Sequence, residues 1–198
     1  DEVRKLTSTR QGQSLYRSAI ITNLRNNVLL GGLTYYFTIK WFCVTEPLPP
    51  AELLLAIARI VVIEAVLYYF AHKAFHEVKG LYWMHSYHHK FNTVVLPSSA
   101  NAVSVAEYTF AYMFPLVIAI VITQADELAA FMAALIVAVT NLLIHTPWLE
   151  HQKYPWMFVT AGDHLSHHRK IKGNYGAPVF HTDRILERLS SLSTAQKV

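Results

Sequence analysis

The chain has 198 residues, of which 53% are hydrophobic and 15% are charged. Soluble domains carry about 25% charged residues, so the composition argues against one soluble domain and indicates a single integral membrane domain over residues 1–198. The formal net charge of +4 does not indicate a nucleic-acid partner, because the basic residues gather on one side of the predicted membrane-spanning helices. The single cysteine, Cys43, excludes an intramolecular disulfide.

Four segments are predicted to be membrane-spanning helices, each close to the roughly 20 apolar residues that a bilayer core requires. They run from about Val28 to Val44, Leu53 to Ala71, Val103 to Ile122 and Leu128 to Ile144. The sequence TEPLPP connects the first pair, and TQADE connects the second pair. Both connectors are short, and the prolines of the first cannot continue a helix. We therefore expect an all-α protein with two helical hairpins and both connectors on one side of the membrane.

The charged residues predict which side of the membrane each end of the helical bundle faces. Of the 17 Lys and Arg residues, Lys40 and Arg59 lie within the predicted spans, and the other 15 lie on the side opposite the connectors. The connectors instead carry Glu46, Glu52, Asp126 and Glu127. By the positive-inside rule, the side opposite the connectors faces the cytosol, in the endoplasmic reticulum of a eukaryote or the inner membrane of a bacterium. All histidines are predicted on that side, as a helical cap over the bundle.

The histidines form a repeated pattern. HKAFH at 72–76 spaces two imidazoles at i and i+4, and both HSYHH at 85–89 and HLSHH at 164–168 space three at i, i+3 and i+4. On a helix each set would share one face. Imidazole is the commonest protein ligand of iron, zinc, copper and nickel, and eight or nine imidazoles suit two ions with four or five ligands each. The predicted ligands are His72, His76, His85, His88, His89, His145, His164, His167 and His168.

Other polar residues are candidates for supporting roles. Asp163, Glu77 and Glu64 could orient the ligand imidazoles through their second ring nitrogen. Glu107, also inside a span, could serve either as such a partner or in a structural ion pair. The remaining histidines are His151, predicted at the surface or beside the site, and His181, for which no ligand role is expected.

The order of these motifs resembles the fatty acid hydroxylase and sterol desaturase superfamily. The similarity covers roughly Leu53 to Leu189 and includes HKAFH, HSYHH, the lone histidine of NLLIHTP, and HLSHHRKIKGNYG. SSANAVSVAEY is also similar, and NYG is followed by Asp183 and Arg184 as in the family. The chain departs from the family pattern at Thr182 and at Glu187-Arg188.

The resemblance implies an integral-membrane enzyme with two iron ions that uses dioxygen to hydroxylate or desaturate an unactivated C–H position of a lipid. Sterols and fatty-acyl chains are the implied substrate types, with zinc able to replace iron in purified protein. The implied electron donor is cytochrome b5 or a ferredoxin-type protein, since the chain has no haem or iron–sulfur motif of its own.

Two other classes of function compete with this one. A membrane zinc metallohydrolase would need a general base beside the metal, as in the H-E-x-x-H motif, which the sequence lacks. A metal transporter or sensor would carry ionisable groups through the depth of the spans, where only Lys40, Arg59, Glu64 and Glu107 occur. Residues 190–198 are predicted to form a flexible tail.

Overall fold

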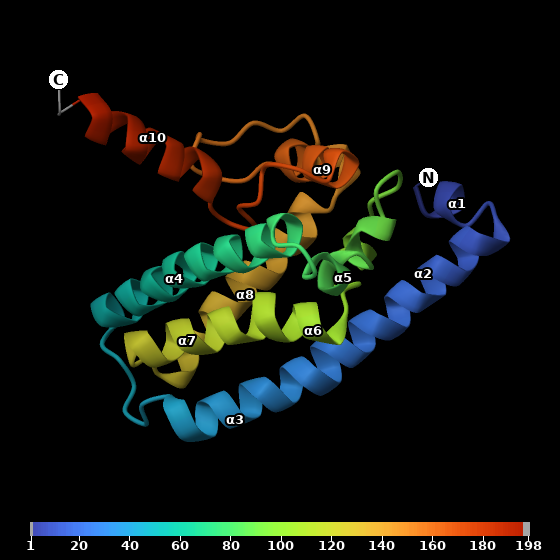
Figure 1. Ribbon diagram of the computed structural model, residues 1–198. Coiled ribbons are helices and arrows are strands. Elements are labelled where there is room, and N and C mark those ends of the chain that lie inside the picture. Colours follow the sequence, from blue (N-terminus) through green and yellow to red (C-terminus); the bar gives the residue numbers. More distant parts are fainter. Residues whose placement is uncertain (1, 196–198) are drawn as a thin grey trace.

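The computed structural model describes residues 2–195, which fold into helices joined by loops (Figure 1). In chain order the elements are α1 (Glu2–Leu6), α2 (Arg10–Asn23), η1 (Leu24–Gly31), α3 (Gly32–Phe42), α4 (Pro50–Glu77), α5 (Tyr82–His85), η2 (His88–Lys90), η3 (Pro97–Ser99), α6 (Val105–Glu107), η4 (Tyr108–Met113), α7 (Phe114–Thr123), α8 (Glu127–Ile144), η5 (Pro147–Leu149), α9 (Ala161–Lys170) and α10 (Thr182–Ala195). The all-α prediction is confirmed for these residues.

Three helices in the described part of the chain are long and apolar enough to cross a membrane. They are α4, α8 and the continuous helix Val105–Thr123, which comprises α6, η4 and α7. α4 begins with Pro50 at its first position, where the missing N–H costs nothing, and it extends through His72 and His76. η4, the middle part of the helix Val105–Thr123, is wound as a π-helix, a form that is rare and often lies at functional sites.

The first predicted span, Val28–Val44, lies at the end of a longer helix. α2, η1 and α3 follow one another without a break in helical backbone from Arg10 to Phe42, and Val44 lies in the connector beyond them. α3 itself has 11 residues, fewer than a span requires. A membrane crossing by this first helix therefore stays a prediction.

The two connectors meet at the same end of the bundle, as the hairpin prediction requires. The N–H of Val44 donates to the carbonyl of Ala125 at 3.0 Å, and the N–H of Leu48 donates to Asp126 Oδ2 at 3.0 Å. Asp126 Oδ1 also accepts the N–H of Ala129 at 2.8 Å and so caps the first turn of α8. One buried carboxylate thereby fastens both connectors to the start of α8.

The bundle is packed closely where the first helix meets η4. A Cβ atom on Gly31 would lie 2.6 Å from the Tyr108 hydroxyl, so a side chain at this position would require the Tyr108 ring to move. Five residues before Gly31, the Asn26 side chain donates to the carbonyls of Asn101 and Val103 at 3.1 and 3.0 Å. These contacts hold the first helix against the segment that precedes α6.

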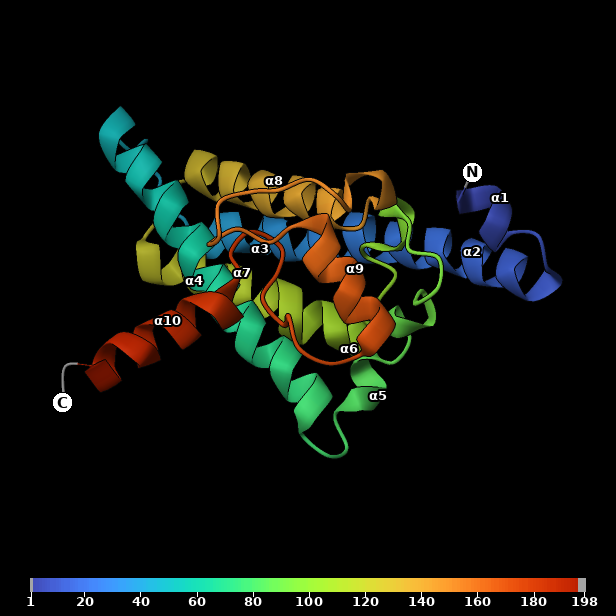
Figure 2. The ribbon, with the colours of Figure 1, turned by 90° about the horizontal axis from the view of Figure 1, so that it is seen from above.

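The elements that follow the spans gather at the end of the bundle opposite the connectors. Figures 1 and 2 show α5 and α9 near the C-terminal ends of α4 and α8, with α9 lying over the other helices in Figure 2. α10 points away from the bundle and continues through Ala195, so residues 190–195 of the predicted tail are helical. Residues 196–198 of that tail lie outside the described residues.

Candidate metal centre

Nine buried or half-buried histidines meet where these elements converge. They form a five-histidine group, made of His72, His76, His85, His89 and His167, and a four-histidine group, made of His88, His145, His164 and His168. Within each group the available ring nitrogens all lie within 4.8 Å of one another. Among these rings only that of His76 is half-buried, and the others are buried. All nine histidines that the sequence analysis selected as ligands are thus brought together.

The HSYHH motif does not form the single helical face that its spacing predicted. α5 ends at His85, and His88 and His89 belong to the 3₁₀-helix η2, so the motif spans two short helices joined by a turn. The change of winding turns His88 away from the other two. As a result His85 and His89 lie in the five-histidine group, and His88 lies in the four-histidine group.

The HLSHH motif lies on a regular helix, yet it is divided in the same way. α9 begins with a capping box in which the Thr160 hydroxyl accepts the N–H of Asp163 at 3.0 Å and Asp163 Oδ2 accepts the N–H of Thr160 at 3.2 Å. His164 and His168, one helical turn apart, belong to the four-histidine group, whereas His167 reaches the five-histidine group. Each motif therefore supplies both groups.

The distances between ring nitrogens fit a shared metal ion in each group. Ligand nitrogens about 2.1 Å from an ion, at angles between about 90° and 180°, lie roughly 3 to 4 Å apart. In the five-histidine group, the Nε2 atoms of His72 and His85 are 2.9 Å apart and those of His76 and His89 are 3.2 Å apart. In the four-histidine group, His164 Nε2 lies 3.0 Å from His145 Nε2 and 3.1 Å from His168 Nε2.

The other ring nitrogen of four histidines is held by an oxygen atom outside the groups. The Nδ1 atoms lie 2.8 Å from the Tyr175 carbonyl for His72, 2.7 Å from the Asn141 carbonyl for His145, 2.7 Å from the Gly173 carbonyl for His167 and 2.6 Å from Glu107 Oε1 for His85. Because each oxygen accepts the Nδ1 proton, the Nε2 lone pair is left free to bind a metal. The buried Nε2 atom of His167 has no hydrogen-bond partner, which fits a nitrogen that could bind a metal ion.

Glu107 is the carboxylate in contact with a ligand histidine. It is buried at the end of α6, where its N–H donates to the Ser104 hydroxyl oxygen at 3.0 Å. The same hydroxyl donates to the carbonyl of Met84 at 2.6 Å, which fixes α6 against α5 next to His85. Of the two roles weighed for Glu107, the geometry supports orientation of a ligand.

Burial lowers the pKa of the histidines of the two groups that lie outside the spans, because a charged imidazolium is poorly solvated among apolar atoms and neighbouring rings. The pKa is about 4 for both His145 and His167. The pKa values of His85, His88, His164 and His168 lie well below the usual range for the same reason. Neutral imidazoles are the form that binds metal.

The three carboxylates predicted to support the ligands lie in different surroundings. The Asp163 carboxylate caps α9, pairs with Arg184 at 2.6 Å and lies 3.8 Å from His181 Nε2. Glu77 is exposed and lies 3.9 Å from Lys73 Nζ. Glu64 is buried in the bundle and lines a cavity. None of the three has a hydrogen bond to one of the nine ligand histidines in the described part of the chain.

The two histidines outside the groups lie apart from the ligands. His151 is exposed in the loop before α9. His181 is buried, with its ring 3.7 Å from Asp183 Oδ2 and 3.8 Å from Asp163 Oδ1. Asp183 in turn accepts the backbone N–H groups of Tyr175 and Gly176 at 3.1 and 2.7 Å. This network holds the segment whose Tyr175 carbonyl orients His72.

The sequence of the chain matches the model of one known protein family. A family model described as fatty acid hydroxylase matches residues 57–187, which is more than half of the chain and includes all nine ligand histidines. No curated protein and no solved structure matches the chain.

Proposed function

This chain belongs to the fatty acid hydroxylase family, and we propose that it is a di-iron oxygenase that hydroxylates or desaturates an unactivated C–H position of a membrane lipid. The observation that carries the proposal is the pair of adjacent histidine groups, with five and four ligand nitrogens, at one end of a bundle of membrane-spanning helices.

The residues of the centre suit iron. Imidazole binds ferrous iron well, and neither histidine group includes a carboxylate or a thiolate. Two bound iron ions would supply the activation of dioxygen that attack on an unactivated C–H bond requires. Neutral imidazoles add no negative charge, so the ions would keep most of their positive charge. Glu107, whose Oε1 lies 2.6 Å from His85 Nδ1, would orient that ligand from behind.

The protein's own groups would keep the centre ordered and dry. The carbonyls of Tyr175, Asn141 and Gly173 fix three ring orientations, as the preceding distances show. The rings of His85, His88 and His168 are at most 1% exposed, so bulk water has little access to the ligands. A buried centre of this kind protects a reactive intermediate from side reactions.

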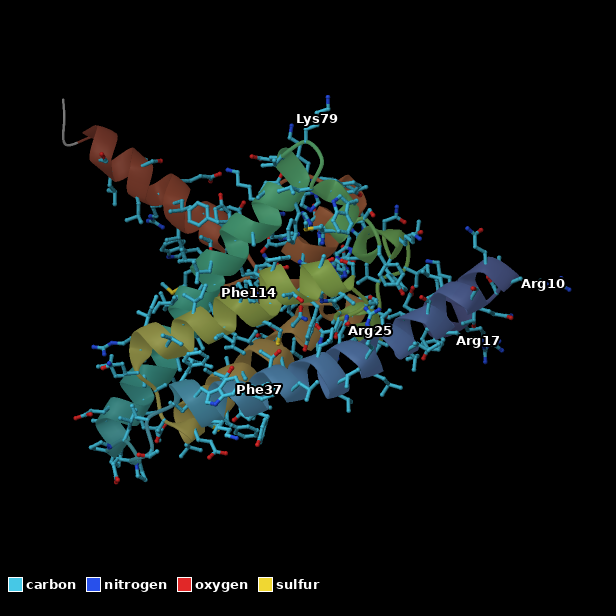
Figure 3. The ribbon with its side chains drawn as sticks, turned by 60° about the horizontal axis from the view of Figure 1, so that its bottom comes forward. Arg10, Arg17, Arg25, Phe37, Lys79 and Phe114 are labelled. Atoms are coloured by element: carbon cyan, nitrogen blue, oxygen red, sulfur yellow. The ribbon has the colours of Figure 1, made fainter. Side chains whose placement is uncertain are left out.

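We further propose that the substrate enters from the bilayer and that the centre faces the cytosol. The basic residues support this orientation, since Lys79, Arg10 and Arg17 lie at the histidine end in Figure 3, whereas Phe114 is exposed on the span Val105–Thr123 and Phe37 on α3. Electrons would come from cytochrome b5 or a ferredoxin-type donor. Exposed Lys79, Lys90 and Lys172 around the centre would favour an acidic partner.

Metal analysis and product analysis test the proposal together. The full chain is purified without chelators from cells grown with iron-57, and its metal content and Mössbauer spectrum are measured. We expect two irons per chain and oxygen-dependent oxidation of a lipid. Zinc bound by this purified protein would not by itself decide the matter, because zinc can replace iron during expression. An active protein with one zinc and no iron requirement would instead indicate a hydrolase, and reversible metal exchange without lipid oxidation would indicate a transporter or sensor.

A further inference from the structure

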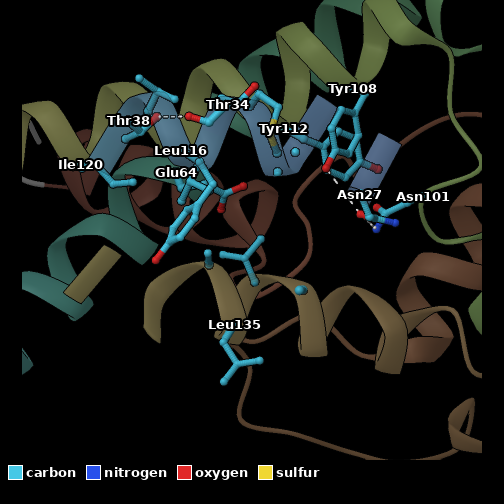
Figure 4. Close-up of a pocket in the computed structure, with 18 of the residues that line it drawn as sticks. Asn27, Thr34, Thr38, Glu64, Asn101, Tyr108, Tyr112, Leu116, Ile120 and Leu135 are labelled. Atoms are coloured by element: carbon cyan, nitrogen blue, oxygen red, sulfur yellow. Dashed lines mark hydrogen bonds between the residues drawn. The ribbon is translucent and has the colours of Figure 1, made fainter. Parts of the chain in front are cut away.

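A cavity of about 370 Å³ lies within the helical bundle, on the connector side of the metal centre. It is bordered by the first helix, α4, η4 with α7, and α8, and its volume falls within the roughly 300–1,000 Å³ that is typical of ligand sites. Figure 4 shows several of its lining side chains. Most of the wall is apolar and includes Met113, Leu116, Ile120, Ala134 and Leu135.

One end of the cavity shares its wall with the metal centre. Asn141 lines the cavity, and its carbonyl lies 2.7 Å from His145 Nδ1. Tyr112 also lines the cavity, and its ring centroid is 5.5 Å from that of Tyr68, which is 5.2 Å from that of His72. A molecule in the cavity would therefore extend toward both histidine groups.

Glu64 is the carboxylate that lines this cavity in the described part of the chain. It is 1% exposed, and its Oε2 atom has no hydrogen-bond partner. Several other polar lining groups are already paired, since the Thr38 hydroxyl donates to the Thr34 carbonyl at 2.7 Å and Asn101 Nδ2 donates to Asn27 Oδ1 at 3.0 Å. Burying an acid within a membrane-spanning helix without a partner is costly, which indicates that its partner is a ligand.

The position of Glu64 determines how such a ligand would be oriented. Glu64 precedes His72 by eight residues on α4, which corresponds to about 12 Å along the helix. A polar group bound at Glu64 would therefore lie deep in the bundle, and the apolar remainder would extend toward the metal centre.

The chemistry of the cavity selects among polar groups. A lipid carboxylate has no hydrogen to donate to Glu64 Oε2, the carboxyl oxygen that has no partner. An ammonium group would bring a full charge into a mostly apolar cavity, where burying a charge costs more than burying a hydroxyl. A hydroxyl has a single donor, which matches the single unpaired acceptor. The cavity also reaches the lipid-facing surface, because the lining residues Phe131 and Leu135 of α8 are 49% and 44% exposed.

We propose that this cavity binds a hydroxyl-bearing lipid and that Glu64 is the residue that selects it by accepting a hydrogen bond from the lipid hydroxyl. The inference rests on the proposed function only for the reaction that follows binding. The hydroxyl could belong to a sterol or to a long-chain alcohol, which share this chemistry.

Binding of radiolabelled lipids to the full chain in detergent tests the proposal under anaerobic conditions, where no turnover occurs. The probes are octadecan-1-ol, cholesterol, octadecane, octadecanoic acid and octadecylamine. We expect at least one of the two hydroxyl lipids to bind about tenfold or more tightly than octadecane, the ratio expected for one net hydrogen bond. Which of the two binds more tightly distinguishes a sterol from a straight-chain ligand.

Two variants of Glu64 and a control identify the residue responsible. Glu64→Leu should reduce the affinity for the hydroxyl lipid to that of octadecane, and Glu64→Gln, which keeps an acceptor oxygen, should restore most of it. The matched control Glu52→Gln changes an exposed acid on the same helix and should leave binding unchanged. The metal content of each variant reports whether the centre has folded.

Several outcomes would overturn the proposal. Equal binding of the hydroxyl lipid by Glu64→Leu and by the original chain would exclude Glu64 as the selecting residue. Tighter binding of octadecanoic acid or octadecylamine would exclude a hydroxyl ligand. Because these measurements need no oxidation, they would stand even if the chain proved not to be an oxygenase, and a failure of binding would leave the iron and product tests unaffected.

Discussion

The role of His88 as a metal ligand can be tested by a single substitution. His88 Nε2 lies 3.4 Å from His145 Nε2 in the four-histidine group, and its ring is buried. Replacing His88 with Ala removes one of four ligand nitrogens, so we expect the metal content to fall from about two ions per chain toward one and lipid oxidation to fall at least 100-fold. Metal analysis and product analysis on the same sample measure both effects.

The control for this variant is His151→Ala, since His151 is exposed and belongs to neither group. That variant should keep its metal and activity. Full metal content and full activity in His88→Ala would contradict the assignment of the four-histidine group.

Glu107 provides a test of ligand orientation. Glu107→Gln keeps the size of the side chain but replaces the carboxyl group that faces His85 Nδ1 at 2.6 Å with an amide. We expect metal affinity to fall about 10-fold to 100-fold, as for other residues that orient metal ligands. Competition with a chelator measures the affinity, and Glu77→Gln, which alters an exposed acid, is the matched control. An unchanged affinity in Glu107→Gln would mean that the contact is purely structural.

The lowered histidine pKa values predict how the stability of the metal-free protein depends on pH. His145 and His167 have pKa values of about 4 in the folded protein, below the value of about 6.5 in an unfolded chain. Between these values the unfolded chain binds more protons, so the free energy of unfolding decreases as the pH falls through this window, and it is constant above about pH 7. Each group would contribute about 3 kcal/mol over the full window.

Thermal unfolding of chelator-treated protein between pH 8 and 5 measures this dependence. The unfolding temperature should be constant at the upper end and should fall below about pH 6.5. Unfolding that is independent of pH across this range would show that the rings are not held neutral in the folded protein.

At the scale of elements, one carboxylate joins two connectors to a helix. Asp126 accepts the N–H groups of Leu48 and Ala129 at 3.0 and 2.8 Å. Asp126→Ala would leave a buried donor unpaired and would remove the cap of α8, so we expect a loss of about 2 to 4 kcal/mol in stability. Thermal unfolding in detergent measures the loss. The neighbouring exposed Glu127, replaced by Ala, should cost less than about 1 kcal/mol, and equal losses would contradict the role of Asp126.

The short elements show where local rules succeed and fail. The Thr160 and Asp163 side chains mark the beginning of α9, and Pro50 marks the beginning of α4, so both starts follow from local sequence. The HSYHH motif has the same histidine spacing as HLSHH, but α5 ends at His85. Spacing alone could not predict this interruption, because it depends on how the segment packs against α4 and α6.

At the scale of the whole molecule, the connectors and the histidines lie at opposite ends of the bundle. In a Cys43→Ser background, a cysteine at Glu46 should react with a membrane-impermeant maleimide from outside intact cells. A cysteine at Lys172 should react only after the membrane is opened, because the basic end is expected to face the cytosol. The two positions are matched in exposure. The reversed labelling pattern would place the metal centre on the outer side.

The sequence by itself determined the class of this protein and its candidate ligands. Long apolar segments require helices in a membrane, short connectors require hairpins, and histidines at i, i+3 and i+4 repeat in motifs that resemble one family. These properties follow from local composition and spacing, which the linear chain carries in full.

Only the tertiary structure decided how the ligands are shared. His85 and His89 separate from His88 because α5 ends at His85 and the 3₁₀-helix η2 follows, and α9 presents His167 to one group and His164 and His168 to the other. The contact of Glu107 with His85, the Tyr175 carbonyl that orients His72, and the cavity around Glu64 arise in the same way. Each joins residues far apart in sequence, and their approach depends on helix packing that no local pattern specifies.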